Sequence, residues 1–150
     1  MFSIVIPLYN EEKNIINLLH EIEISLSKYN KYEIILVDDA SSDETLKIIN
    51  DHKNSKIRTF KNNINTGQSY SITKGINNSS YEIIVTLDGD GQNDPKDIPK
   101  LLDLYFSLSG CKLVGGIRKK RMDSVIKIIS SRIANFIRSK MLNDDCKDTG

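Results

Sequence analysis

The chain has 150 residues, of which 39% are hydrophobic and 27% are charged, and its formal net charge is +1. These values are typical of a soluble globular domain that is long enough to bury a core. A net charge so close to zero gives no general electrostatic reason to expect nucleic acid as a partner, and the sequence contains no internal repeat or low-complexity linker.

The positive charge is concentrated late in the chain. Residues 112–140 contain nine Lys or Arg and one acid, Asp123, so the remainder of the chain carries a net charge of −7. We therefore expect a phosphorylated substrate or an anionic surface to meet the C-terminal third.

The sequence shows no sign of disulfide bonds, secretion or membrane spans. Cys111 and Cys146 are isolated and suggest neither a disulfide scaffold nor a zinc site, so a reducing compartment is expected. The N-terminus leads directly into a strand pattern without a secretory signal, and no apolar run approaches membrane-spanning length.

Taken in chain order, the pattern predicts strands that alternate with helices. Strands are expected over residues 3–7, 33–37, 57–60, 83–87 and 113–114. Helices are expected over residues 11–27, 41–51, 68–76, 95–106 and 123–142. Asn10 is the expected N-cap of the first helix, with Glu11 and Glu12 in its first turn, and Pro95 is expected to open the fourth. This alternation predicts a doubly wound α/β domain with a mostly parallel sheet and helices on both faces.

A polar cluster follows each of the first four predicted strands, at residues 7–12, 38–43, 62–67 and 88–94. In parallel sheets, ligands gather at the carboxyl ends of the strands, so these clusters predict one binding edge. Some of these residues could have a structural role instead of binding a ligand. Glu11 could equally well interact with the dipole of the first helix. Asp38 and Asp39 fit a capping turn through Ser41 or Ser42, in which one of the two acids would stay free for a ligand.

The loop after the fourth strand contains Asp88 and Asp90 around a glycine, Gly89. Two carboxylates at this spacing can face one point, and the missing Cβ of the glycine would let a ligand approach. Such a pair is a usual way to hold Mg²⁺ or Mn²⁺ beside a diphosphate, although a solvated turn is the simpler alternative. An EF-hand calcium loop is excluded, because Asn93 and Pro99 occupy the positions that require Gly and Glu.

The sequence lacks both the GxGxxG and the GxxxxGK[ST] phosphate loops, which argues against a dinucleotide-dependent dehydrogenase or a P-loop enzyme. Three segments, IVIPLYNEE (residues 4–12), IILVDDASSD (34–43) and LDGDGQNDP (87–95), instead resemble family 2 glycosyltransferases of GT-A fold. The similarity is greatest to the branch with dolichol-phosphate mannose synthase and bacterial polyprenyl-phosphate glycosyltransferases. It covers almost the whole chain and keeps the order of the motifs.

The resemblance implies a role for each matching residue. On the nucleotide side, Pro7, Tyr9 and Glu11 would line the pocket and Asp39 would contact the base or ribose. Asp88 and Asp90 match the DxD motif, which binds the divalent metal, Mg²⁺ or Mn²⁺, and the donor diphosphate. Gln92 matches a glutamine that follows this motif in the branch.

On the acceptor side, Arg118 and Arg121 match a segment that places arginines against the acceptor phosphate. Arg132 is predicted at the edge of the apolar stripe of the last helix, from which its side chain could reach a cleft, and an ordinary salt bridge is the alternative. We therefore expect Arg118 and Arg132 to bind phosphate, and Lys127 and Arg138 to be solvated.

The resemblance implies a metal-dependent, inverting transfer of sugar from a UDP- or GDP-linked donor to a polyprenyl phosphate in cell-envelope glycan or glycolipid synthesis. It places this activity in the cytoplasm at the inner face of the cytoplasmic membrane, with peripheral membrane contact and without nucleic acid; homo-oligomerisation remains open. A saccharide acceptor, and a sugar-nucleotide-binding module without turnover, are the alternatives. In the family the chain continues beyond a motif like Asp148-Thr149-Gly150, so residues 1–150 are expected to be a GT-A catalytic domain shortened at its C-terminal end.

Overall fold

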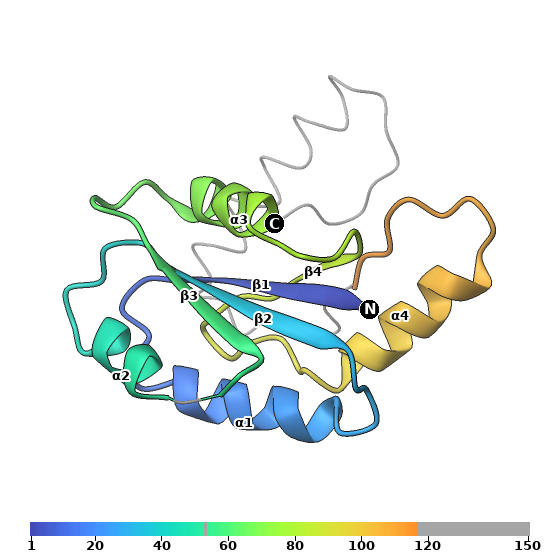
Figure 1. Ribbon diagram of the computed structural model, residues 1–150, viewed down its shortest axis with the longest axis horizontal. Coiled ribbons are helices and arrows are strands. Elements are labelled where there is room, and N and C mark those ends of the chain that lie inside the picture. The colour runs from blue at the N-terminus through green and yellow to red at the C-terminus, as the bar shows by residue number, and fades with distance from the viewer. Residues whose placement is uncertain (53, 117–150) are drawn as a thin grey trace, which may run out of the picture. The chain divides into compact units, whose positions relative to one another are not determined.

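The computed structural model describes residues 1–52 and 54–116. Residues 1–112 form one compact unit with four strands: β1 (Phe2–Leu8), β2 (Tyr32–Asp38), β3 (Ile57–Lys61) and β4 (Ile84–Thr86). Its helices are α1 (Ile15–Ser25), α2 (Thr45–Asp51), α3 (Gln68–Asn77) and α4 (Asp97–Ser107). The strands form a parallel sheet with the order β3-β2-β1-β4 (Figure 1).

The two central strands are apolar along most of their length because both of their faces are covered. In the register of the sheet, Ile4 of β1 lies between Ile34 of β2 and Val85 of β4. Side chains alternate between the faces. Ile4 and Ile6 therefore belong to one buried cluster, whereas Val5 belongs to another.

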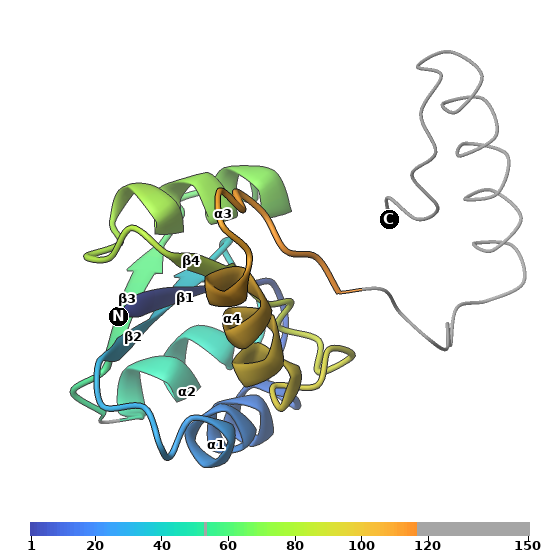
Figure 2. The same ribbon diagram turned by 90° about the vertical axis from the view of Figure 1, so that its right-hand side faces the viewer.

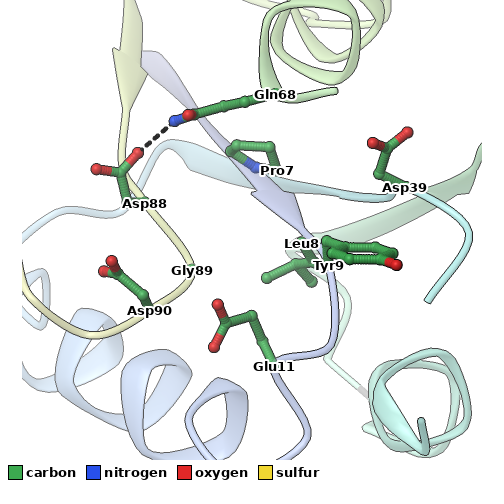
Figure 3. A pocket seen from close by; sticks show the side chains of 9 residues that line it. All are labelled: Pro7, Leu8, Tyr9, Glu11, Asp39, Gln68, Asp88, Gly89 and Asp90. Atoms are coloured by element: carbon green, nitrogen blue, oxygen red, sulfur yellow. Dashed lines mark hydrogen bonds between the residues drawn. The ribbon is translucent and has the colours of Figure 1, made fainter. Parts of the chain in front are cut away.

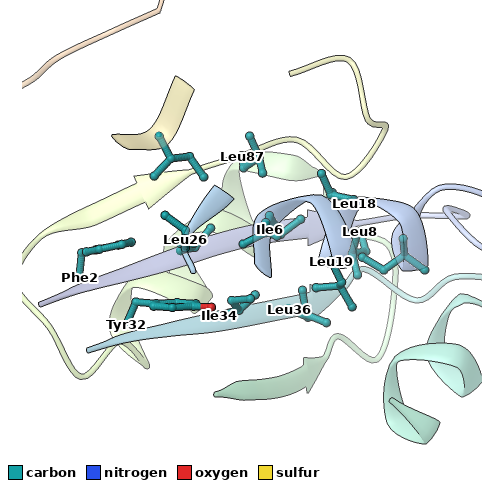
Figure 4. Close-up of a cluster of buried hydrophobic side chains, with 14 of the residues drawn as sticks. Phe2, Ile6, Leu8, Leu18, Leu19, Leu26, Tyr32, Ile34, Leu36 and Leu87 are labelled. Atoms are coloured by element: carbon teal, nitrogen blue, oxygen red, sulfur yellow. The ribbon is translucent and has the colours of Figure 1, made fainter. Parts of the chain in front are cut away.

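The helices form two layers around the sheet. Figures 1 and 2 show α1 and α2 on one face and α3 on the other. The larger cluster joins the first face to α1, α2 and α4, and its residues include Leu18, Leu19, Ile22, Ile49 and Leu102 (Figure 4). This packing fixes the sheet edge from which the polar loops emerge.

Helix α3 packs very closely on the opposite face. A Cβ added at Gly75 would clash with Cγ1 of Val5 and would lie 3.3 Å from Cγ2 of Val37. A glycine is therefore required for this close approach between helix and sheet. The position of α3 matters because its first turn reaches the binding edge.

The first helix begins later than the sequence predicted. Helix α1 starts at Ile15, and Asn10, with φ of +57°, is not its N-cap. The side chain of Asn10 instead accepts hydrogen bonds from the backbone N–H and the hydroxyl of Ser42. Glu11 and Glu12 consequently lie before the helix, and no acid occupies its first turn. The prediction failed because a contact across the fold replaced a local cap.

Two later predictions also need correction. Helix α4 starts at Asp97, so Pro95 lies in the turn before it. The strand predicted at residues 113–114 is absent, because residues 111–116 have no regular structure. The helix predicted over 123–142 lies outside the described residues. None of the described helices has the length and hydrophobicity needed to cross a bilayer.

Candidate functional site

A pocket of about 230 Å³ lies at the carboxyl ends of the strands. It opens beside β1 and β4, where the strand order reverses, which is where ligands bind in doubly wound sheets. Figure 3 shows Asp88 and Asp90 on one side of it and Asp39 on the other. The lining residues are Pro7, Leu8, Tyr9, Glu11, Asp39, Gln68, Asp88, Gly89 and Asp90.

Asp88 and Asp90 come from the loop after β4 and are both half-buried. The two oxygens of Asp88 accept hydrogen bonds from side-chain amides, Gln68 Nε2 at 2.6 Å and Asn93 Nδ2 at 3.0 Å. Asp90 Oδ1 accepts the backbone N–H of Gln92 at 2.9 Å, which tightens the turn. The loop thus directs two carboxylates to one pocket, as the spacing predicted.

Gly89 lines the pocket and also has a packing role that the sequence did not predict. A Cβ at this position would lie 2.5 Å from Leu8 Cδ2 and 3.0 Å from the carbonyl oxygen of Pro7. The missing side chain therefore lets the aspartate loop pack against the end of β1.

The carboxylate of Asp39 is buried and accepts hydrogen bonds from four donors. Oδ1 accepts Asn62 Nδ2 at 2.7 Å and Thr66 Oγ1 at 2.8 Å, the N–H of Thr66 reaches both oxygens, and Oδ2 accepts the N–H of Gly67 at 2.7 Å. Burial alone would raise the pKa of Asp39, but these donors outweigh it and lower the pKa from 3.8 to about 2. Asp39 therefore stays ionised and holds the loop before α3.

The structure assigns a local role to Asp38 as well. Its Oδ2 accepts the N–H of Ser41 at 3.3 Å, as the capping interpretation predicted, and its Oδ1 is buried without a hydrogen-bond partner among the described residues. The expectation that the other acid of the pair would stay free is wrong, because Asp39 is engaged by the loop at residues 62–67.

The loops after β1 and β2 are bonded to each other, and this fixes the pocket wall. The N–H of Asn10 donates to Ser41 Oγ at 3.0 Å and the N–H of Glu11 donates to Thr45 Oγ1 at 2.8 Å. The carboxylate of Glu11 accepts Asn14 Nδ2 at 2.7 Å and lines the pocket. Tyr9, which is 49% exposed, adds an accessible aromatic ring. The backbone contact with Thr45 and the side-chain contact with Asn14 hold Glu11 in place.

The pocket can accept a divalent cation together with a phosphorylated ligand. Among the described residues, no group of three His, Cys, Asp or Glu side chains is arranged to hold a metal by itself. Asp88 and Asp90 supply two hard oxygen donors at an open site, and Mg²⁺ usually takes one or two carboxylates and completes its shell with phosphate oxygens and water. The residues present therefore fit the predicted Mg²⁺ or Mn²⁺.

Six of the predicted site residues come together in the pocket: Pro7, Tyr9, Glu11, Asp39, Asp88 and Asp90. Gln92 is exposed and is not among the lining residues; its backbone supports Asp90 instead. Arg118, Arg121 and Arg132 lie outside the described residues. Gln68 was not predicted from the sequence, although the preceding loop, residues 62–67, was expected to lie at the binding edge.

The comparisons with known proteins agree with this geometry. The family model described as glycosyl transferase family 2 matches residues 3–148. The chain belongs to this family. It is 36% identical to an undecaprenyl-phosphate 4-deoxy-4-formamido-L-arabinose transferase of Yersinia pestis, over 99% of this chain and 46% of that protein. It is 34% identical to the transferase of the same name from Aeromonas hydrophila, over 100% of this chain and 47% of that protein.

Two solved glycosyltransferase structures support the GT-A fold. S. aureus TarS is 26% identical, with a TM-score of 0.52 over 70% of this chain and 33% of its own. The mannosyltransferase PcManGT from Pyrobaculum calidifontis, solved with GDP-Man and Mn²⁺, is 23% identical, with a TM-score of 0.57 over 64% of this chain and 29% of its own. The predicted α/β GT-A fold is thereby confirmed. The chain spans about half the length of the curated relatives it matches.

Proposed function

We propose that this family 2 chain carries the donor-binding site of a glycosyltransferase that moves a sugar from a UDP- or GDP-linked donor to a polyprenyl phosphate. The observation that carries the proposal is a pocket at the ends of β1 and β4, with Asp88 and Asp90 on one side and Asp39 and Tyr9 on the other (Figure 3). A nucleotide sugar needs such a site, because its diphosphate and its nucleoside require different partners.

The nucleoside belongs on the side of Asp39 and Tyr9. The exposed ring of Tyr9 offers a surface against which a base can pack. Asp39 keeps its charge and fixes the loop at residues 62–67, so that any contact with base or ribose is made by a preorganised carboxylate. The volume of about 230 Å³ is below the roughly 300–1,000 Å³ usual for ligand cavities, so part of the donor would remain outside it.

The diphosphate belongs on the side of Asp88 and Asp90. Bound there, Mg²⁺ or Mn²⁺ would compensate the negative charge that develops on the departing diphosphate. Asp88 and Asp90 would hold the cation, while Glu11 adds a further carboxylate to the lining. TarS has been solved in complex with UDP, and PcManGT with GDP-Man and Mn²⁺; these ligands are properties of those proteins.

The acceptor proposal has two supports. The relatives from Yersinia pestis and Aeromonas hydrophila are named as undecaprenyl-phosphate transferases. A phosphate acceptor is already anionic near neutral pH, so it needs orientation and charge compensation more than a general base. Arg118 and Arg132 in the basic stretch of residues 112–140 would supply these at the membrane face.

Titration of the chain with UDP-, GDP- and dTDP-sugars, with Mn²⁺ and with a chelator, tests the donor proposal. We expect one nucleotide to bind in the presence of Mn²⁺ and binding to be lost with the chelator. Absence of binding to every nucleotide would overturn the proposal. If donor binds but no sugar reaches polyprenyl phosphate, the binding module without turnover becomes the better description, and transfer to a saccharide would favour the other alternative.

A further inference from the structure

The carboxylate of Asp88 is held by one amide on each oxygen. Asn93, which donates to Oδ2, belongs to the same loop as Asp88. Gln68, which donates to Oδ1 at 2.6 Å, comes from the first turn of α3, and its side chain reaches Asp88 at the pocket wall (Figure 3). The orientation of Asp88 therefore depends on an element that is separate from its own loop.

The backbone that carries Gln68 is itself held in place. The residues immediately before it, Thr66 and Gly67, donate their backbone N–H groups to Asp39. Later in α3, Gly75 lets the helix lie directly on Val5 of the sheet. Both ends of the helix are thus anchored, and a side chain supported in this way can hold its partner in one geometry.

We propose that Gln68 is a positioning residue of the cation and diphosphate site, an inference that rests on the proposed function. A carboxylate oxygen has two lone pairs, so an amide that donates to it does not by itself exclude a cation. The amide is neutral, and unlike a lysine or an arginine it does not repel the cation that it helps to place. Partners that orient metal-binding carboxylates typically contribute about 10–100-fold to metal affinity.

The test is the substitution Gln68→Met, which keeps the length and the helix propensity of the side chain and removes the donor. Mn²⁺ is titrated calorimetrically into the 150-residue chain in the presence of a fixed excess of UDP, and separately of GDP, with the heat of Mn²⁺ binding to nucleotide alone subtracted. We expect the affinity for Mn²⁺ to fall by about 10-fold. Gln68 is exposed, so the thermal midpoint measured without metal should not change.

Ser69→Ala is the matched control, because Ser69 is exposed and lies in the same turn of α3. Its affinity for Mn²⁺ should equal that of the parent. A parental or higher affinity in Gln68→Met would overturn the positioning role and leave the proposed function intact. A weaker affinity accompanied by a lower metal-free midpoint would also overturn it, since that pattern indicates damage to the fold. If the parent binds no Mn²⁺ with either nucleotide, the proposed function fails and the inference fails with it.

Discussion

At the scale of single residues, Asp90 is the most direct test of the cation site. Asp90→Asn keeps the shape of the side chain and its contact with the N–H of Gln92, but it removes one of the two carboxylates that the loop after β4 adds to the pocket. Because the neutral amide attracts and orients the cation less strongly than a carboxylate, we expect the affinity for nucleotide diphosphate with Mn²⁺ to fall at least about 10-fold. Calorimetry on parent and variant measures this, and equal affinities would contradict the assignment.

Asp39 predicts a dependence of stability on acid. Its pKa is lowered from 3.8 to about 2 in the fold, so its carboxylate contributes roughly 2 kcal/mol above pH 3.8, and that contribution is lost as the pH falls towards about 2. Urea denaturation between pH 5 and pH 2.5 should show this loss in the parent. The loss should be smaller in Asp39→Asn, which has no such group to titrate. If the free energy of unfolding falls with pH equally in both proteins, Asp39 is not the cause of the acid sensitivity.

At the scale of elements, the packing of α3 on the sheet connects stability to the site. Gly75→Ala puts a methyl group where Val5 already lies, so the helix must shift away from the sheet. We expect a net loss of about 1–2 kcal/mol in the free energy of unfolding, because overpacking costs about 1–3 kcal/mol and the better helix propensity of alanine returns up to about 1. Chemical denaturation measures the loss, with Ser69→Ala as a helix control that should stay within about 0.5 kcal/mol of the parent.

The same shift should also disturb the pocket, because Gln68 lies seven residues earlier on α3. A stable Gly75→Ala protein with parental affinity for Mn²⁺ and nucleotide would show that helix position and site are independent. A variant as stable as the parent would show that the core accommodates the methyl group.

The sequence predicted those features that depend on local pattern. The central strands were placed within one residue at each end, since runs such as Ile34–Val37 are apolar and β-branched whatever surrounds them. The helix start at Asn10 was wrong because its side chain bonds to Ser42, 32 residues away. The link between Gln68 and Asp88 was missed for the same reason, since it exists only once α3 lies on the sheet.

A structural carboxylate escaped notice in the same way. Glu33 at the start of β2 accepts hydrogen bonds from Ser3 Oγ at 2.7 Å, from Arg58 at 3.0 Å and from the N–H of Ser80. Glu33 thereby connects β1, β2, β3 and the loop before β4 at the amino ends of the strands. Each of its partners is far from it in the sequence. In the sequence it is one acid in a strand pattern, and only the folded arrangement shows that it is buried and bonded.

At the scale of the whole molecule, donor and acceptor functions fall in different parts of the chain. Every residue assigned to the pocket lies between Pro7 and Asp90, whereas the basic stretch of residues 112–140 follows it. The chain also spans only about half of its curated relatives. Binding of the donor and transfer to the acceptor should therefore be separable by substitution.

Arg118 provides that separation. A lipid phosphate is a compact anion that a guanidinium group can bind through two parallel hydrogen bonds, and Arg118 follows the Gly115-Gly116 segment in the basic stretch. We expect Arg118→Ala to reduce transfer to polyprenyl phosphate at subsaturating acceptor by about 10-fold or more, the loss of one charged hydrogen-bonded contact, while the affinity for nucleotide with Mn²⁺ stays unchanged. Arg132→Ala should act in the same direction.

Both quantities are measured on an active form of the protein that contains this chain, with Arg138→Ala as the control because that side chain is predicted to face solvent. If Arg118→Ala loses affinity for the donor, Arg118 must instead be assigned to the nucleotide site. If Arg118→Ala transfers sugar to polyprenyl phosphate as fast as the parent, the lipid-phosphate assignment fails. A saccharide acceptor would then need a carboxylate base, for which Asp144, Asp145 and Asp148 are the candidates late in the chain.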